Sequence, residues 1–291
     1  MQIVLHIGAN CTDGDLLVRS LTKNARALAA EGTAIPGLAK YRRLLRETIQ
    51  NLGGGTPDPG TRDILIDAIL DEPDAKRLVM SNSAFICLPI RVFEAGEFYG
   101  LVTMKLRALT QLFPNDDIEL CLALRNPATF VPAAFETVKN RSFQGFMNGI
   151  SPHTIRWSEL ITRIQAIAPR AKLTVWCNED TPLIWGEILR RMTAAPDGAK
   201  LTGEFDVLST IMSGEGMARF ASYLNAHPPQ DEGQLRRVIS AFLDKYAIES
   251  EIEEEIDLPD WSERLVEELT VLYEADVEHI AQMPGVDFIS P

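Results

Sequence analysis

Short apolar segments alternate with stretches of helical periodicity along this chain. Four of these segments are typical of interior strands, namely residues 3–7, 77–81, 118–124 and 172–176. Apolar positions at helical spacing follow each of them, as at Leu17, Leu21 and Leu28 after the first. This alternation implies right-handed crossovers and a mainly parallel sheet covered by helices on both faces. We therefore expect a three-layer α/β protein with about four to five strands.

The rest of the pattern predicts loops and a helical end. Residues 53–60 and 228–233 are rich in glycine and proline, which predicts loops. From residue 231 onward apolar positions recur at helical spacing, with Leu235 and Ile239 as examples. We expect a single domain over residues 1–291, with the helical C-terminal region 231–291 packed on the sheet.

Composition favours a globular cytoplasmic protein. Of the 291 residues, 46% are hydrophobic and 24% are charged, which is ordinary for a folded domain. The chain starts with a strand and not with a signal sequence, and no uncharged run reaches the length of a membrane span. The four cysteines are widely separated and the four histidines lack metal-ligand spacing. We expect reduced thiols, no metal site and no membrane span.

The negative charge is concentrated in one region. The net charge is −13, and residues 249–278 contain thirteen acidic residues against a single basic one, Arg264. Nucleic-acid binding is disfavoured, because affinity for a phosphate backbone depends on clustered lysine and arginine. The acidic run is either a solvated helix face with its connecting loop or a docking surface for a basic protein partner.

The loop after the first strand has the geometry of an anion cradle. It runs from Gly8 to Asp15 and opens a helix, whose first N–H groups have no intrahelical partner. However, it contains no lysine, and the carboxylates of Asp13 and Asp15 stand where a phosphate would lie. These residues either cap the helix, as the position of Asp13 suggests, or hold a divalent cation that reverses their charge.

The third strand ends in a second candidate anion site. Arg125, Asn126 and Pro127 follow it, and Pro127 suits the first turn of a helix predicted over residues 128–140. In a parallel sheet Arg125 would lie close to the first loop, because ligand-binding residues gather at the carboxyl ends of the strands. Its guanidinium either holds a phosphate by paired N–H bonds or pairs with a carboxylate.

Three further residues have two readings each. Cys11 is a small buried residue or, near a helix N-terminus, a reactive thiol. His6 is an interior imidazole or a general base. His153 follows a proline on a loop, and nothing in the sequence places it at a pocket.

Several segments in order resemble the sulfotransferase family that uses 3′-phosphoadenosine-5′-phosphosulfate, in particular its bacterial branch. The resemblance covers most of the chain and rests on residues 5–8, 78–81, 124–127, 173–179 and 272–276. It implies a P-loop NTPase-like architecture, the phosphosulfate nucleotide as co-substrate, and a hydroxyl acceptor such as a saccharide or a lipid head group.

The resemblance also implies which residues contact the nucleotide. The loop amides would cradle the 5′-phosphosulfate, and Arg125 would hold the 3′-phosphate. The implied cofactor-binding residues are Gly8, Asn10, Cys11, Thr12, Asp13, Gly14, Asp15 and Arg125. The catalytic base is unassigned.

The chain departs from the family pattern at functional positions. Cys11 replaces the loop lysine and Ala133 replaces the helix serine, while Asp13 and Asp15 replace a glycine and a hydroxyl residue. Sulfuryl transfer needs positive charge at the departing oxygen, and losing one such donor typically slows catalysis by about 10²–10³.

Three hypotheses follow from these departures. One is a divergent sulfotransferase in which another cation, Arg19, Arg91 or Arg107, replaces the lysine. The second is a non-catalytic descendant that acts as a binding or regulatory protein, with the acidic region 249–278 as its contact surface. The third is a different phosphate-ligand enzyme on the same fold.

Overall fold

A single parallel sheet organises the molecule. The computed structural model describes residues 1–71, 74–252, 256, 258 and 261–291. The sheet has six strands, and every neighbouring pair is parallel. Across the sheet the order is β2 (Thr33–Ala34), β3 (Arg77–Ser81), β1 (Gln2–Gly8), β4 (Asp117–Leu124), β5 (Lys172–Cys177) and β6 (Val286–Ile289). The predicted parallel α/β class is confirmed.

The strand order reverses direction between β1 and β4. From β1 the chain first builds β2 and β3 on one side, and then crosses to the other side to add β4, β5 and β6 in turn. In open parallel sheets a crevice forms outside the carboxyl ends of the strands at such a reversal. Gly8 and Leu124 end the two strands there, so the first loop and Arg125 both start at this crevice.

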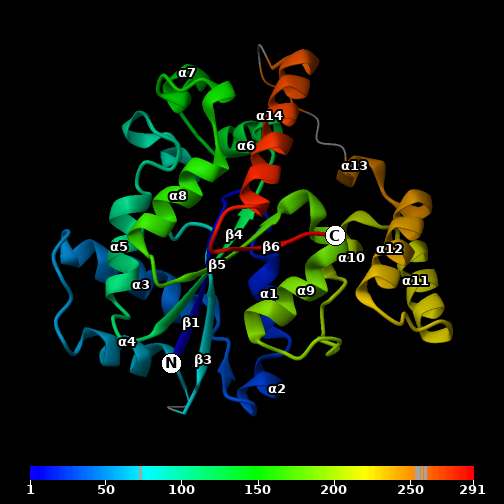
Figure 1. The fold of residues 1–291 in the computed structure, drawn as a ribbon, viewed down its shortest axis with the longest axis horizontal. Helices are drawn as coiled ribbons and strands as arrows, with labels where there is room; N and C mark the ends of the chain where they lie inside the picture. The colour runs from blue at the N-terminus through cyan, green and yellow to red at the C-terminus, as the bar shows by residue number, and fades with distance from the viewer. Residues whose placement is uncertain (72–73, 253–255, 257, 259–260) are drawn as a thin grey trace.

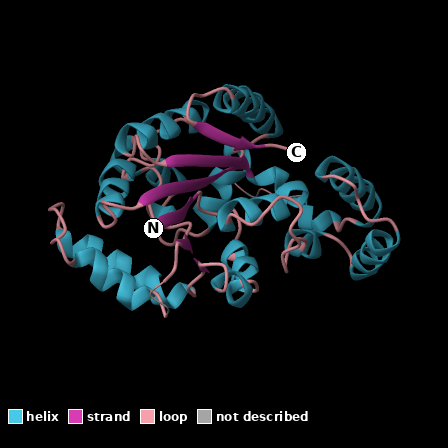
Figure 2. Ribbon diagram, turned by 60° about the horizontal axis from the view of Figure 1, so that its bottom comes forward, coloured by secondary structure: helices cyan, strands magenta, loops and turns pink. Residues whose placement is uncertain are grey.

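Helices cover both faces of the sheet (Figures 1 and 2). One face is covered by α3 (Leu38–Leu52), α4 (Thr61–Ile69), α5 (Val102–Gln111), α6 (Pro127–Glu136), α8 (Trp157–Ile167) and α14 (Glu263–Ala281). The other is covered by α1 (Leu16–Thr22), α2 (Ala25–Ala29) and α9 (Thr181–Thr193). Alternation along β1 divides its side chains between them: Leu5 faces the first set and Val4 the second.

A helical extension lies beyond α9. It consists of α10 (Asp206–Ile211), α11 (Gly214–Ala226), α12 (Glu232–Tyr246) and α13 (Glu249–Ile252), which lie to the right of the sheet in Figure 1. Leu208, Phe220 and Ile239 form a small core of their own inside it. The remaining helices are α7 (Phe143–Met147) and four short 3₁₀ turns at Pro89–Arg91, Glu94–Gly96, Pro152–Thr154 and Asn178–Asp180.

Two predicted elements differ from the observed ones. The helix predicted over residues 128–140 ends at Glu136 and gives way to a turn. The C-terminal region contains the helices α12, α13 and α14, as expected, but Val286–Ile289 then add the strand β6. Among the described residues this strand pairs with β5 alone, and its four residues carry too few alternations to be recognised in the sequence. Within the described residues, no helix is long and apolar enough to cross a membrane.

Candidate functional site

The loop between β1 and α1 uses its own polar groups to stabilise the helix start. Leu17 donates its backbone N–H to Asp13 Oδ2 at 2.9 Å, and Leu16 donates to the Asp13 carbonyl at 2.8 Å. As predicted, the Asp13 side chain accepts an N–H of the first turn, whereas Asp15, which occupies the N-cap position, makes no side-chain cap hydrogen bond. The Asp13 carboxylate therefore already occupies this loop, and an anionic ligand would have to compete with it for the Leu17 N–H.

The second carboxylate of this loop is paired with a residue that the sequence did not single out. Asp15 Oδ1 accepts from Arg42 Nη2 at 2.5 Å, and Asp15 Oδ2 accepts from Nη1 at 3.3 Å. Arg42 lies on α3, which follows β2 in the sequence. No local signal in the sequence links residues 15 and 42, because only the packing of α3 brings them together.

Asn10 ties the loop to the segment after β3. Its side-chain amide donates to the carbonyls of Ser83 and Cys87 at 3.0 Å each, and its Oδ1 accepts from the Tyr99 hydroxyl at 2.8 Å. Burial raises the pKa of Tyr99 well above its ordinary value, so the phenol stays protonated and remains a donor. Asn10 thus has a structural role, with its side-chain groups used inside the protein.

Gly8 is required by a close backbone approach. Its φ is +136°, and a Cβ there would lie 3.3 Å from the Ser83 carbonyl oxygen. A side chain would be strained at this position, so the turn out of β1 depends on glycine.

Arg125 lies against the first loop, as the parallel sheet predicts. It is buried, with 7% of its surface exposed, and its Nη1 donates to the Cys11 carbonyl. Its Nε donates to Thr129 Oγ1 at 3.1 Å, and its carbonyl accepts from Trp157 Nε1 at 2.9 Å. The structure therefore brings Arg125 and the first loop into direct contact.

The end of β5 adds an exposed acid, Glu179, to the same crevice. Glu179 Oε1 accepts from the Asn126 backbone N–H at 2.7 Å, and its Oε2 accepts from the Tyr273 hydroxyl at 3.0 Å. Burial, with the neighbouring Glu179 carboxylate, raises the pKa of Tyr273, which keeps its proton on the donating oxygen. The role of Glu179 was not assigned from the sequence, since it depends on a contact with α14.

A cavity of about 670 Å³ opens at the carboxyl ends of β1, β4 and β5. Thr12, Asp13 and Gly14 of the first loop line it, together with Arg125. The lining does not include Gly8, Asn10, Cys11 or Asp15, so the structure divides the residues that the sequence grouped as one site.

Only one of the three cations considered as replacements for the lysine reaches this cavity. Arg19 of α1 lines it. Arg91 instead forms an ion pair with Glu94, and Arg107 lies on α5, on the opposite face of the sheet from α1. Arg19 is exposed and makes no ion pair within the part of the chain that the structure describes.

His6 is an interior residue beneath the loop. Its Nδ1 lies 2.8 Å from Ser81 Oγ, and its ring stacks on Trp176 with the centroids 5.6 Å apart. Burial lowers the pKa of His6 from its ordinary value of 6.5, so the neutral ring is favoured at neutral pH. The interior reading is confirmed. His153 lies on the surface, where its Nε2 is 3.0 Å from Glu268 Oε2.

The acidic region is only partly a solvated surface. Glu263, Glu267, Glu274 and Glu278 are exposed on α14 at spacings that share one helix face. Asp276 instead is buried and accepts from the backbone N–H groups of Trp157 and Ser158 at the start of α8. Residues 253–255, 257 and 259–260 of this region lie outside the described residues. The basic partner stays a prediction.

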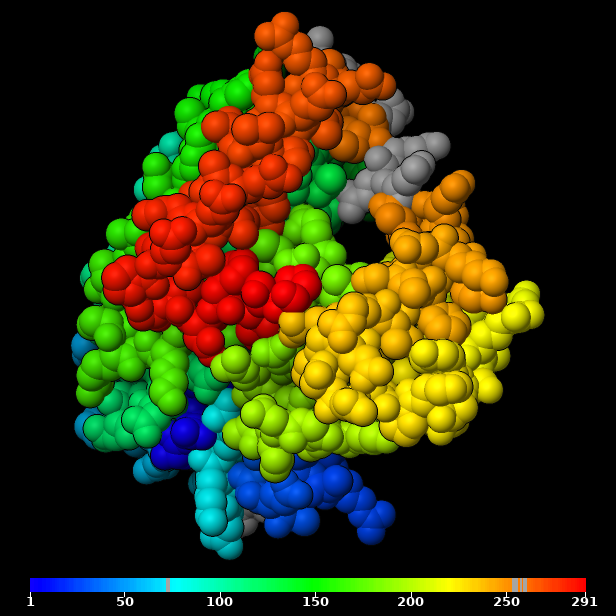
Figure 3. All heavy atoms as spheres, turned by 45° about the vertical axis from the view of Figure 1, so that its right-hand side comes forward, coloured from blue at the N-terminus to red at the C-terminus, as the bar shows by residue number. Residues whose placement is uncertain are grey.

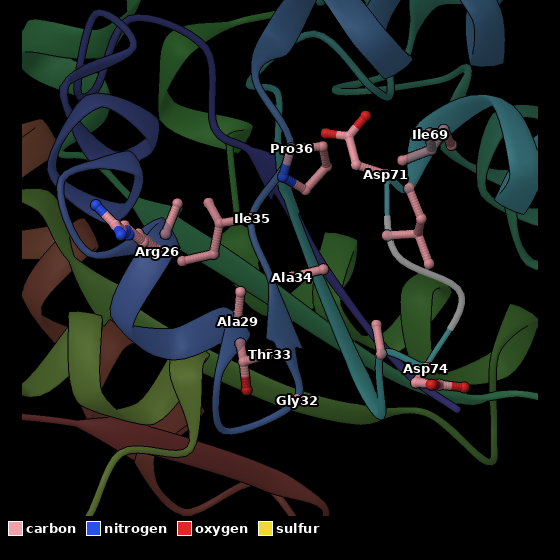
Figure 4. A pocket seen from close by; sticks show the side chains of 13 residues that line it. Arg26, Ala29, Gly32, Thr33, Ala34, Ile35, Pro36, Ile69, Asp71 and Asp74 are labelled. Atoms are coloured by element: carbon pink, nitrogen blue, oxygen red, sulfur yellow. The ribbon is translucent and has the colours of Figure 1, made fainter.

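A smaller cavity of about 290 Å³ lies at the β2 edge of the sheet (Figure 4). Arg26, Ile35, Asp71 and Asp74 are among the side chains that surround it. None of the residues that the sequence proposed for a site lines this cavity. Across the described ranges, no group of three or more histidine, cysteine or acidic side chains is arranged to hold a metal ion.

Comparison with known proteins gives one distant likeness. No protein-family model and no curated protein matches the sequence. A crystal structure of a sulfotransferase from Alicyclobacillus acidocaldarius is similar over 82% of this chain and 97% of that chain, with 12% sequence identity and a TM-score of 0.42. The chain therefore has a distant structural similarity to a bacterial sulfotransferase.

Proposed function

We propose that this protein binds a small molecule in the cavity at the carboxyl ends of β1, β4 and β5, and does not transfer a sulfuryl group. One observation carries the proposal: the carboxylates of the first loop interact with other groups of the protein. Asp13 accepts a hydrogen bond from the Leu17 N–H, and Asp15 forms an ion pair with Arg42.

These contacts oppose a phosphosulfate in the loop. A phosphate there would meet two carboxylates at short range, and repulsion between like charges is only partly screened near a protein surface. It would also have to displace the Asp13 oxygen from the Leu17 N–H. The loop is therefore arranged for internal stability and not for stabilising a departing anion.

The cavity itself has the properties of a binding site. Its volume of about 670 Å³ is within the usual range for small-molecule pockets, about 300–1,000 Å³. Arg19 and Arg125 supply positive charge, and Thr12 and Asn126 supply hydrogen-bonding groups. Such a combination of a few polar groups with apolar walls is typical of ligand pockets.

Two assays with the purified chain test this proposal. The first incubates it with 3′-phosphoadenosine-5′-phosphosulfate and a simple phenol or sugar, and follows consumption of the donor by mass spectrometry. The second titrates 3′-phosphoadenosine-5′-phosphate by calorimetry, with and without Mg²⁺. We expect no consumption of the donor and no micromolar binding of the nucleotide.

Binding of a fluorescent dye tests whether the cavity takes up a small molecule. The anionic dye 1-anilinonaphthalene-8-sulfonate should bind at one site per chain. Trp185 lines the cavity, so energy transfer from its indole to the bound dye should be lost in Trp185→Phe. Loss of dye binding on blocking the cavity with Thr210→Trp would support the assignment. The absence of saturable dye binding in the intact protein would contradict it.

A second candidate is sulfuryl transfer from 3′-phosphoadenosine-5′-phosphosulfate to a hydroxyl acceptor. The observation that favours it is the contact between Arg125 and the loop at Cys11, which joins the two implied phosphate sites. Under this candidate the proposed cofactor-binding residues remain those of the first loop with Arg125. Micromolar nucleotide binding that disappears in Arg125→Ala, or formation of a sulfated product, would support it and overturn the first proposal.

A further inference from the structure

The helical extension carries a groove whose charge is opposite to that of the whole molecule. The groove lies between α11 and α12 and has a volume of about 450 Å³. Its lining includes two cations, Arg219 and Lys245, and none of the described residues that line it is acidic. The whole chain, in contrast, has 41 acidic residues against 28 basic ones. Positive charge is therefore gathered at this groove on a protein of negative net charge.

Aromatic rings also line the groove. The rings of Tyr223, Phe242 and Tyr246 follow one another, with centroids 5.8 Å apart at each step. The guanidinium carbon of Arg219 lies 5.9 Å, and the Lys245 Nζ lies 5.4 Å, from the centroid of the Tyr246 ring. Attraction between a cation and a ring face holds both charges at this end of the groove. Tyr223 is 40% exposed, so apolar surface remains uncovered beside the two cations.

Neighbouring acids do not cancel the charge of the groove. Arg219 forms an ion pair with Glu215 at 2.8 Å, but both side chains are more than half exposed and solvent screens the pair. Asp244 precedes Lys245 in α12 and does not line the groove. Lys245 makes no ion pair within the described part of the chain. Its ammonium group is therefore free to meet an acidic partner.

A surface of complementary charge lies on α14. Glu263, Glu267, Glu274 and Glu278 are exposed there, and Val271 among them is 65% exposed. Positions 267, 271, 274 and 278 are separated by four, three and four residues, which places them in one row along the helix. These four glutamates make no ion pair with any residue that the structure describes. An exposed apolar side chain is thus surrounded by unpaired negative charge.

We propose that the groove between α11 and α12 receives this acidic face of α14 from a second copy of the chain. Each surface has an exposed apolar side chain at its centre, Tyr223 in the groove and Val271 on the helix, with charges of opposite sign around it. The lengths also match. The acidic row spans about 22 Å from residue 263 to residue 278, and the 13 residues of α11 span about 20 Å.

The contact forms between molecules because the two surfaces lie apart within one. α14 packs mainly on α6 and α8, whereas α11 and α12 pack on each other. Figure 3 shows the orange-to-red α14 and the yellow α11 and α12 at separate places on the molecular surface. The surfaces are unlike, so the contact is head-to-tail: it leaves a free groove on one chain and a free helix face on the other.

The net charge sets the conditions under which association is measured. The charge of −13 makes two copies repel each other at long range. At about 0.1 M salt the Debye length is about 10 Å, so charges outside the contact are largely screened while those across it attract. At about 1 M salt the Debye length falls to about 3 Å, and the attraction is screened as well. We expect reversible association at the lower salt concentration that weakens at the higher one.

Sedimentation velocity of the full chain over a wide range of concentration tests the contact. The average sedimentation coefficient should rise with concentration at the lower salt. Lys245→Glu in the groove and Glu267→Lys on α14 should each weaken self-association at least about tenfold, which corresponds to about 1.4 kcal/mol. Arg26→Glu on α2 and Glu31→Lys make the same changes of charge at exposed positions outside both surfaces, and they should have no effect.

Mixing the two variants separates this contact from a general effect of charge. Lys245→Glu retains an intact α14 face, and Glu267→Lys retains an intact groove. An equimolar mixture should therefore form one-to-one complexes, although each variant alone stays monomeric. Both substituted residues are exposed, so folding is retained, and circular dichroism checks this.

Three results would overturn the proposal. One is a chain that stays monomeric at every concentration at the lower salt. Another is self-association that Lys245→Glu and Glu267→Lys leave unchanged, since a different surface would then form the contact. The third is a monomeric chain that binds poly-L-glutamate and loses this binding in Lys245→Glu, which would assign the groove to an acidic segment of another protein. None of these results affects binding in the cavity at the strand ends.

Discussion

The two faces of the sheet are packed with different kinds of side chain. On the face covered by α5, α6 and α8, the rings of Phe98, Tyr99, Phe130 and Trp157 pack against one another, with centroids between 4.9 and 6.3 Å apart. On the face covered by α1 and α9, polar groups occur among apolar ones. There His6 lies beside Trp176, and Ser20 of α1 donates to Asp206 of α10.

This difference separates stability from binding. Packed aromatic rings bury large areas, and the two polar groups among them, the Tyr99 hydroxyl and the Trp157 indole N–H, both donate to partners, so the first face stabilises the fold. The second face leads to the cavity, where polar groups and exposed apolar side chains remain. Substitutions should therefore affect global stability most on the aromatic face, and ligand binding most around α1, α9 and α10.

The largest expected effect is the loss of an aromatic ring from the first face. Phe130 is fully buried between Phe98, Tyr99 and Trp157. Phe130→Ala should lower the free energy of unfolding by about 3–5 kcal/mol, because it removes apolar contacts and leaves a cavity. Urea denaturation measures this. Ile64→Ala, at a residue 69% exposed, should change stability by less than about 0.5 kcal/mol; a similar small loss in Phe130→Ala would contradict the comparison.

A polar anchor between α14 and α8 comes next. Asp276 accepts from the N–H groups of Trp157 and Ser158 at 2.7 and 3.2 Å, and from the Ser158 hydroxyl. Asp276→Ala should cost about 2–3 kcal/mol, since it leaves the first N–H groups of α8 without their acceptor. Thermal and urea unfolding test this, with Glu274→Ala on the exposed face of α14 as the control. Equal effects of the two substitutions would show that Asp276 is not an anchor.

A smaller, pH-dependent effect is expected on the second face. Burial lowers the pKa of His6 below its unfolded value of 6.5. Between these two values the unfolded chain binds a proton that the folded protein does not. Stability is therefore full above about pH 6.5 and is lost as the pH falls towards the folded pKa, with a slope of at most about 1.4 kcal/mol per pH unit.

The contribution of His6 is isolated by difference. Urea denaturation of the intact protein and of His6→Gln is compared between pH 5.5 and 7.5, and the intact protein should lose more stability on acidification. Surface pairs such as His153 with Glu268 are present in both proteins and cancel. Parallel pH profiles would mean that His6 becomes protonated in the folded state as readily as in the unfolded one.

The smallest effect concerns the ion pair between Asp15 and Arg42. Both side chains are a little more than one third exposed, so solvent screens the attraction. A double-mutant cycle with Asp15→Asn and Arg42→Gln should give a coupling of about 0.2–1 kcal/mol, weaker at high salt. The exposed pair of Arg43 with Glu47 is the control. A coupling that salt does not change would argue against an ion pair at the loop.

Much of the fold was predictable because parallel sheets have strong local signals. The four apolar segments were recognised, because buried strands are continuous apolar runs, whereas the helices between them have apolar residues at helical spacing. The strand β2 has two residues and β6 has four, and such short edge strands carry too little pattern. The contact between Arg125 and the first loop was also predictable, because it follows from the topology of the sheet.

The chemistry of the site was less predictable. The resemblance implies that Asn10 and Asp15 contact a nucleotide, and this stays a prediction; what the sequence did not indicate is that the Asn10 side chain holds the segment after β3 and that Asp15 pairs with Arg42 of α3. These uses depend on residues that are 27 or more positions away. No spacing rule in the first loop indicates them, because the partner is chosen by how the helices pack.

From the amino-acid order alone follow the α/β class, the hydrogen bond that Asp13 accepts from the first turn of α1, and the meeting of Arg125 with the first loop. These features depend on neighbours in sequence or on the fixed geometry of parallel strands. The tertiary structure alone decided that Arg42 pairs with Asp15, and that residues of α1, α9, α10, α13 and α14 line one cavity. The reason is physical: such contacts join segments far apart in the chain, and they form only when the hydrophobic faces of whole helices are buried together.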